Sequence, residues 1–361
     1  MLSLPRGKLE EYLSHVFGKN VEVVDIKRIG GGKEDIKEVG YGVPRLIEAR
    51  IEGETKKMVM SFVVPGPYGH EYMPDRAQVV LLAHQTYNKL PRHVRSFDCG
   101  GVTSRGEIVS VGKVEEFFVL MEYAEGELYK ADLDRISEEK KLKQIDVDRA
   151  LALSNYLVEI HKTKRNEPSL YIRRIRDLVG HGEGVMGLLD TYTPNPEYAT
   201  EEDLIKIEKK CVEWRWKLKR YVHRLSVVHG DYHPWNVLFR QGIDFTLLDR
   251  SRGEWGEPAD DITAMTINYI FFSVLTFGSL AEPFKRLFDL FYENYLEKTG
   301  DEEILKVVPP FYAWRGSVIS HPQWYPTLTP ETRRKLLNFI NTVLESEEFN
   351  PKEVNSYLKG S

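Results

Sequence analysis

A cluster of polar residues interrupts short apolar runs in the middle of the chain. The stretch HGDYHPWN spans residues 229–236, with VV before it and VLF after it, and the next apolar run, IDFTLLD, ends at Asp249. Runs rich in β-branched and aromatic residues with polar ends are typical of short strands joined by loops. We therefore expect Asp231, Asn236 and Asp249 at the ends of strands, inside a region that is otherwise helical.

The first third of the chain differs in pattern from the remainder. Helical spacing at 8–18 and 75–89 flanks β-branched runs, and the runs that predict strands lie at 21–29, 44–52, 57–65, 108–114 and 116–123. After Gly126 the spacing is helical, most clearly at 148–162, 201–223 and 329–345. The segment 165–200 is expected to be a loop-bearing insertion. A chain of 361 residues is expected to form two domains, which we place at 1–123 and 124–361.

Composition and charge exclude several classes of function. A net charge of −5 and a pI near 6.1 provide no basic face for nucleic acid. The apolar runs are too short or too interrupted for a membrane span or a signal peptide. Cys99 and Cys211 are too few for a disulfide framework, so we expect a cytoplasmic protein. The sequence does not indicate an oligomeric state.

The polar cluster suits phosphoryl transfer better than zinc chemistry. Such transfer needs a carboxylate near the attacking hydroxyl and oxygen ligands for Mg²⁺. Asp231 and Asn236 lie five residues apart, and Asp249 follows thirteen residues later. The pattern His-x-Asp-x-His at 229–233 is an alternative that suits a metal-dependent hydrolase, but no second pair of ligands follows it.

The motifs HGDYHPWN and LLDRSRGEWGEPADDI together resemble the catalytic core of the aminoglycoside phosphotransferase and choline kinase families, relatives of the protein kinases. The resemblance implies an α+β, bilobal protein-kinase-like fold, with a small antiparallel-sheet N-terminal lobe and a larger, mainly helical C-terminal lobe. It implies transfer of the γ-phosphoryl group of ATP or GTP to a hydroxyl of a small molecule. Asp231 would be the base, Asn236 and Asp249 would hold Mg²⁺, and the loop would be supported by His229, His233 and Asp261.

Nucleotide binding is expected in the N-terminal lobe, where one family feature is missing. The third strand has no lysine near Ser61, the position at which kinases hold the α- and β-phosphates. Lys57 or Lys33 could replace it. The other nucleotide-binding candidates are the glycine-rich turn and the backbone of the hinge, namely Gly30, Gly31, Gly32, Glu122, Tyr123 and Ala124.

The acceptor is left open by the sequence. The candidates for contact with it are Glu254, Trp255, Trp314 and Trp324. Acidic and aromatic side chains suit a cationic or sugar-like compound, whereas Arg315 favours an anionic one. Because the strand lysine is absent, a nucleotide-binding pseudokinase without turnover remains an alternative, and a protein kinase is another.

Overall fold

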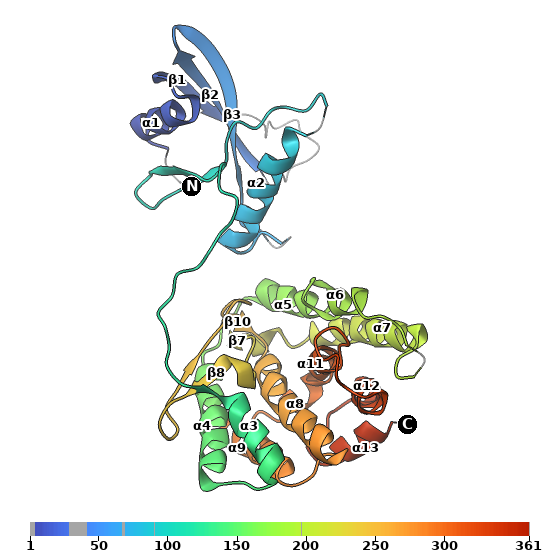
Figure 1. Cartoon of the computed structure of the whole chain (residues 1–361). Coiled ribbons are helices and arrows are strands. Elements are labelled where there is room, and N and C mark those ends of the chain that lie inside the picture. Colours follow the sequence, from blue (N-terminus) through green and yellow to red (C-terminus); the bar gives the residue numbers. More distant parts are fainter. Residues whose placement is uncertain (1–3, 29–41, 67–68, 90, 196, 361) are drawn as a thin grey trace. The chain divides into compact units, whose positions relative to one another are not determined.

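A computed structural model of the chain describes residues 4–28, 42–66, 69–89, 91–195 and 197–360 (Figure 1). The chain divides into two compact units, Met1–Met121 and Glu122–Ser361. The first unit mixes helices with small antiparallel sheets, and the second is mainly helical. The α+β, bilobal fold class predicted from the sequence is confirmed. Over the described ranges, no helix combines the length and apolar character that a membrane span requires.

The N-terminal unit is built around the antiparallel sheet β1–β2–β3, with one helix packed on it. Leu9 and Leu13 of that helix are buried against Val21, Val23 and Ile47 of the strands, which alternate with outward-facing residues. The elements of this unit are α1 (Arg6–Phe17), β1 (Val21–Arg28), β2 (Gly42–Ile51), β3 (Glu54–Val63), α2 (Met73–Tyr87), β4 (Gly100–Val102) and β5 (Ile108–Ser110). β4 and β5 form a separate two-stranded sheet.

The strand predicted at 116–123 is wrong. Residues 114–125 have no regular secondary structure, and Phe118 and Leu120 are exposed. Among the described residues, no strand pairs with this segment. An alternation of apolar residues shows that the side chains suit a sheet. A strand also needs a neighbouring strand for its backbone hydrogen bonds, and the pattern does not report that.

The C-terminal unit surrounds one buried helix, α8, whose residues from Pro258 to Val274 are all buried. A helix that is apolar on every side is expected to be buried on every side. α8 contacts helices α3, α4, α9, α11 and α12 (Figure 1). Its first turn nevertheless carries Asp260 and Asp261, so two carboxylates lie in the interior of the unit.

The helices of this unit are α3 (Tyr129–Glu139), α4 (Gln144–His161), α5 (Pro168–Gly180), α6 (Val185–Asp190), α7 (Glu201–Leu218), α8 (Pro258–Phe277), α9 (Phe284–Thr299), α10 (Ile304–Val307), α11 (Pro309–Ile319), α12 (Pro330–Glu345) and α13 (Val354–Lys359). Short 3₁₀ turns occur at η1 (Val222–Arg224), η2 (Pro234–Asn236) and η3 (Pro351–Glu353). The helices predicted at 148–162, 201–223 and 329–345 correspond to α4, α7 and α12.

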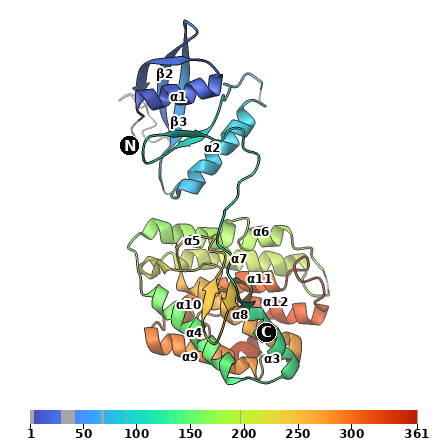
Figure 2. The same ribbon diagram turned by 60° about the vertical axis from the view of Figure 1, so that its left-hand side comes forward.

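The loop-bearing insertion predicted at 165–200 is largely helical, because it contains α5 and α6. One face of α5 is buried through Leu170, Tyr171, Ile175 and Leu178, a helical spacing masked by its arginines. α5, α6 and α7 contact one another and lie together on one side of the unit (Figure 2).

Five short strands position the polar motif. β6 (Glu127–Leu128), β8 (Val237–Phe239) and β9 (Phe245–Leu247) form one antiparallel sheet, while β7 (Ser226–Val227) pairs with β10 (Trp255–Gly256). Residues 228–236 therefore connect strands of two different sheets. This arrangement agrees with the sequence prediction of a polar loop between short strands.

Candidate active site

The loop at 229–236 is anchored to the first turn of α8. The buried carboxylate of Asp261 accepts hydrogen bonds from the backbone N–H of His229 at 2.8 Å and of Gly230 at 2.7 Å. Its Oδ2 also lies 3.2 Å from Nε2 of His161 on α4. Burial acts to raise the pKa of Asp261, but the hydrogen bonds from His161 and from the loop hold that pKa below its ordinary value. Gly230 has a φ of 84°, a conformation that favours glycine, so the turn before the next residue is fixed.

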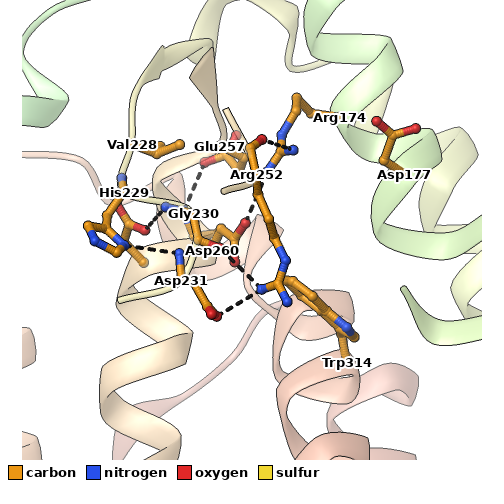
Figure 3. Close-up of polar contacts among 12 residues, drawn as sticks. Arg174, Asp177, Val228, His229, Gly230, Asp231, Arg252, Glu257, Asp260 and Trp314 are labelled. Carbon is orange, nitrogen blue, oxygen red and sulfur yellow. Dashed lines mark hydrogen bonds and ion pairs between the residues drawn. The ribbon is translucent and has the colours of Figure 1, made fainter. Parts of the chain in front are cut away.

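That next residue, Asp231, has both carboxylate oxygens occupied by donors. Its Oδ1 accepts from Arg315 at 2.6 Å and from Arg252 at 2.8 Å, as Figure 3 shows for Arg252. Its Oδ2 lies 3.3 Å from Nδ2 of Asn236 and 3.5 Å from Nε2 of His233. Although burial acts to raise the pKa of Asp231, His233 and the two guanidinium groups hold it well below its usual range. Asp231 is therefore ionised at neutral pH.

Asn236 and Asp249 lie at adjoining ends of β8 and β9. The backbone N–H of Leu248 donates to the carbonyl of Asn236 at 2.9 Å, and Nδ2 of Asn236 donates to the carbonyl of Asp231 at 3.0 Å. The structure thus joins the loop that carries Asp231 and Asn236 to the strand end that carries Asp249. Asp249 has a φ of 52° and accepts from the N–H of Ser251 at 3.2 Å.

The oxygens at these strand ends fit a magnesium ion. Within the described part of the chain, the side-chain hydrogen bonds of Asn236 all use Nδ2, so its Oδ1 is not engaged. Asp249 is exposed, and its side-chain hydrogen bond among the described residues uses Oδ1, which accepts from the N–H of Ser251. Amide and carboxylate oxygens are hard ligands of the kind that Mg²⁺ takes, together with water and phosphate oxygens.

The two histidines of the motif support the loop. Nδ1 of His229 accepts from the N–H of Asp231 at 3.2 Å, and burial lowers the pKa of this imidazole, which favours its neutral form. Nδ1 of His233 accepts from the N–H of Trp235 at 3.2 Å. Within the described ranges, no group of three or more His, Cys, Asp or Glu side chains is arranged to hold a metal ion. Both imidazoles are therefore used by the loop itself.

The nucleotide-binding candidates lie elsewhere in the chain. Gly30, Gly31, Gly32 and Lys33 are outside the described residues. Lys57 on β3 is exposed, and its Nζ lies 3.3 Å from Oε1 of Glu48 on the neighbouring strand. Glu122 and Tyr123 are exposed, Ala124 is half-buried, and all three have no regular secondary structure.

The four acceptor candidates have different environments. Glu254 accepts from the indole N–H of its neighbour Trp255 at 2.6 Å. Trp324 is 54% exposed and lies beside His321, with ring centroids 5.6 Å apart and the ring planes tilted by 41°. Trp314 is buried and is the only one of the four that the described contacts bring to the Asp231 network, through Arg252 and Arg315.

Sequence reasoning missed four residues of this network: His161, Arg174, Arg252 and Asp260. Asp261 is named from the sequence as a support of the loop, but nothing in the sequence indicates that His161 reaches Asp261 or that Asp260 pairs with arginines. Arg252 lies in a polar segment where any arginine is ordinarily solvated. Only burial and distance reveal that these side chains converge.

The family comparison agrees with the motif. The Phosphotransferase enzyme family, abbreviated APH, matches residues 98–295, more than half of the chain. The chain belongs to this family and is a phosphotransferase of the aminoglycoside phosphotransferase type, as the sequence resemblance implies. None of the curated proteins matches the chain.

Several solved structures are similar to the chain at low identity. An amicoumacin kinase, in complex with AMP-PNP, Ca²⁺ and Ami, is 15% identical over 91% of this chain and 91% of its own, with a TM-score of 0.41. A Plasmodium vivax ethanolamine kinase is 14% identical over 92% and 80% of the two chains, with a TM-score of 0.35. A spectinomycin phosphotransferase, in complex with ADP and spectinomycin, is 13% identical over 99% of both, with a TM-score of 0.34.

Proposed function

We propose that this phosphotransferase is a small-molecule kinase that transfers the γ-phosphoryl group of ATP or GTP to a hydroxyl of a small metabolite or aminoglycoside-like compound. The observation that supports this most directly is the Asp231 carboxylate, buried, ionised and held beside Asn236 by a braced loop. Asp231 would accept a hydrogen bond from the acceptor hydroxyl, orient its oxygen toward the phosphorus and receive its proton. Asp261, His229 and His233 would keep the loop in shape.

The strongly lowered pKa of Asp231 favours orientation over strong basicity. The transition state of phosphoryl transfer is loose in most analyses, so little proton transfer is needed before the phosphoryl group moves. Positioning of the hydroxyl and stabilisation of charge then supply most of the rate enhancement. A carboxylate that is fixed by four neighbouring donors suits that task.

Asn236 and Asp249 are the residues that we propose would hold Mg²⁺. When bound, the ion would neutralise charge on the nucleotide phosphates. The hydrogen bond from the N–H of Leu248 to the carbonyl of Asn236, which joins the adjoining strand ends, supports this assignment. The ion would be bound through few protein ligands, as is usual for magnesium in phosphoryl-transfer enzymes.

We place the nucleotide contacts in the N-terminal unit and at its end. The backbone of Glu122 to Ala124 would meet the base, and Lys57 or the turn at Gly30, Gly31 and Gly32 would meet the phosphates. Lys57 supports this because its side chain is 65% exposed, and its ion-pair partner among the described residues is the half-buried Glu48 across the strand pair. A cytoplasmic location remains the expectation, and both cysteines are free thiols.

The test is a screen of hydroxyl compounds with purified protein, Mg²⁺ and ATP or GTP, in which phosphorylated products are followed by mass. Phosphorylated product that forms with the wild type but not with Asp231→Asn supports the proposal. Magnesium-dependent nucleotide binding without turnover of any acceptor would instead favour a pseudokinase, the alternative that the absent strand lysine suggests. Unchanged turnover by Asp231→Asn would remove Asp231 from the assignment.

A further inference from the structure

Three arginines and two buried carboxylates form a continuous network at the proposed acceptor side of Asp231. Arg315 bonds to Asp231 at 2.6 Å and to Asp260 at 2.5 Å, while Arg174 lies 3.5 Å from Asp260 and donates to the carbonyl of Arg252 at 2.6 Å. Arg252 closes the network through its own bond to Asp231 (Figure 3). Three guanidinium groups thus share two buried carboxylates, and the third carboxylate near them, Glu183, is an exposed one beside Arg252.

The two arginines that contact Asp231 are held very differently. The side chain of Arg315 is 7% exposed and also donates to the carbonyl of Gly230 at 3.0 Å, so it is a fixed part of the interior. The side chain of Arg252 is 22% exposed and belongs to the segment between β9 and β10. Its other carboxylate partner, Glu183, is 65% exposed and 3.4 Å away. Such an exposed pair is weak, so of the two arginines Arg252 is the one that is released from Asp231 at the lower cost.

The Oδ1 atom of Asp231 cannot accept a hydroxyl while both arginines remain. Arg315 and Arg252 already donate to this oxygen, which has about two lone-pair sites. An acceptor hydroxyl that binds at Oδ1 must therefore replace one of the two arginines. If it replaces Arg252, a guanidinium group loses its anionic partner beside the bound acceptor.

The aromatic surface behind Arg252 keeps that guanidinium group at the site. The Arg252 guanidinium lies 4.8 Å from the ring centre of Trp314, whose other cationic neighbour, Arg315, is at 4.0 Å. The indole N–H donates to the carbonyl of Glu183 at 2.9 Å, which fixes the ring. Arg252 can thus exchange its hydrogen-bond partner while it stays on a planar surface.

Two acids of the motif that could attract a cationic acceptor, Glu254 and Glu257, are already engaged. Glu257 is buried and accepts from Arg224 at 3.0 Å and from Tyr171 at 2.8 Å, so it cannot face a ligand. Glu254 is engaged with the indole of Trp255. The Nε of Arg315, by contrast, is buried and has no partner among the described residues, so a donor is left unused.

We propose that Arg252, supported by Trp314, leaves Asp231 when the acceptor binds and pairs with an oxyanion of that acceptor, a carboxylate or a phosphate. This inference rests on the proposed kinase function and narrows its substrate to hydroxyl compounds that carry such a group. Arg252 is then a specificity residue. Its planar fork matches both kinds of oxyanion in bidentate geometry.

The test measures the binding of matched compounds by calorimetry, without nucleotide. Glycerate, glycerol 3-phosphate, glycerol and 3-amino-1,2-propanediol share a three-carbon skeleton and differ in charge. Inorganic phosphate is measured as well, to distinguish binding of a free anion from binding of an acceptor that carries an anionic group. We expect the two organic anions to bind at least about tenfold more tightly than the neutral and the cationic compound. Arg252→Gln should weaken their binding by about tenfold or more, equivalent to about 1.4 kcal/mol.

Arg240→Gln is the matched control, because Arg240 is a half-exposed arginine of the same unit whose carboxylate partner is Asp244. It should leave anion binding unchanged, and circular dichroism should show that both variants are folded. Equal anion binding by wild type and Arg252→Gln, preference for the ammonium compound, or no anion binding by the wild type would each overturn the proposal.

Asp231→Asn separates this inference from the kinase assignment. The variant should lose phosphotransfer yet retain anion binding, because Arg252 is then free of its partner. Turnover of amine acceptors that depends on Asp231 but not on Arg252 would refute the anion inference alone. Anion binding through Arg252 without any phosphotransfer would refute the kinase assignment alone.

Discussion

The loop at 229–236 and strand β3 each carry a charged side chain that the proposed reaction uses, Asp231 and Lys57, and the first is buried whereas the second is exposed. Asp231 is buried among four side-chain donors, and its loop is braced from α8 by Asp261. Lys57 is 65% exposed and has one partner, Glu48, on the next strand. An exposed ion pair is worth about 0–1 kcal/mol, whereas breaking a buried one costs about 3–5 kcal/mol. Interior contacts therefore position Asp231, whereas in the proposed function the bound nucleotide would position Lys57.

The largest effect is expected from removal of the negative charge at Asp231. Asp231→Asn should lower the rate of phosphotransfer by about 10²–10⁴-fold, because the amide neither accepts the hydroxyl proton nor orients the hydroxyl in the same way. Product formation measured by mass under saturating nucleotide tests this. Asp244→Asn, which changes an exposed aspartate of the same unit, should retain activity.

The next effect comes from the brace beneath the loop. Asp261→Asn should lower the free energy of unfolding by about 1–3 kcal/mol. The NH₂ group of the new asparagine would replace one carboxylate oxygen, so a donor would face a buried backbone N–H donor of the loop. Urea denaturation of wild type and variant measures it. A variant as stable as the wild type would show that the hydrogen bonds that Asp261 accepts from the backbone of His229 and Gly230 do not stabilise the unit.

Lys57→Ala should have the opposite effects to Asp261→Asn, with little change in stability and weaker binding of the nucleotide. Stability should change by less than about 1 kcal/mol, because the ion pair that is lost has an exposed lysine and a long N–O distance of 3.3 Å. If Lys57 meets the nucleotide phosphates, the KM for nucleotide should rise by about tenfold, as expected for loss of a charged hydrogen bond. Lys56→Ala on the same strand is the control. An unchanged KM would transfer the role to the turn that contains Lys33.

The sequence predicts the loop because its parts are local. Asp231 and Asn236 occupy one turn, and Asp249 follows after a single hairpin, so spacing alone indicates that they come close together. The arginine network was not predictable in this way. Arg174, Arg252 and Arg315 come from α5, a loop and α11, and only their contacts with Asp231 and Asp260 show that they form one network. The wrong strand at 116–123 has the same origin, because strand pairing depends on distant residues.

The smallest effect separates two adjacent acids, Asp260 and Asp261. Asp261 has a pKa below its ordinary value, so its contribution to stability is complete above about pH 4 and is lost as the pH falls through its folded pKa. Burial raises the pKa of Asp260 despite Arg315 and Arg174, so its contribution is greatest below about pH 4 and is lost as the pH rises through its folded pKa. The difference in the free energy of unfolding between wild type and Asp261→Asn should therefore become smaller as the pH falls. The same difference for Asp260→Asn should change in the opposite direction, in favour of the wild type at low pH. Urea denaturation from pH 3 to 7 measures both differences. If both change in the same direction with pH, the two carboxylates titrate as one group, and the separate roles of Asp261 in the loop and Asp260 in the arginine network are wrong.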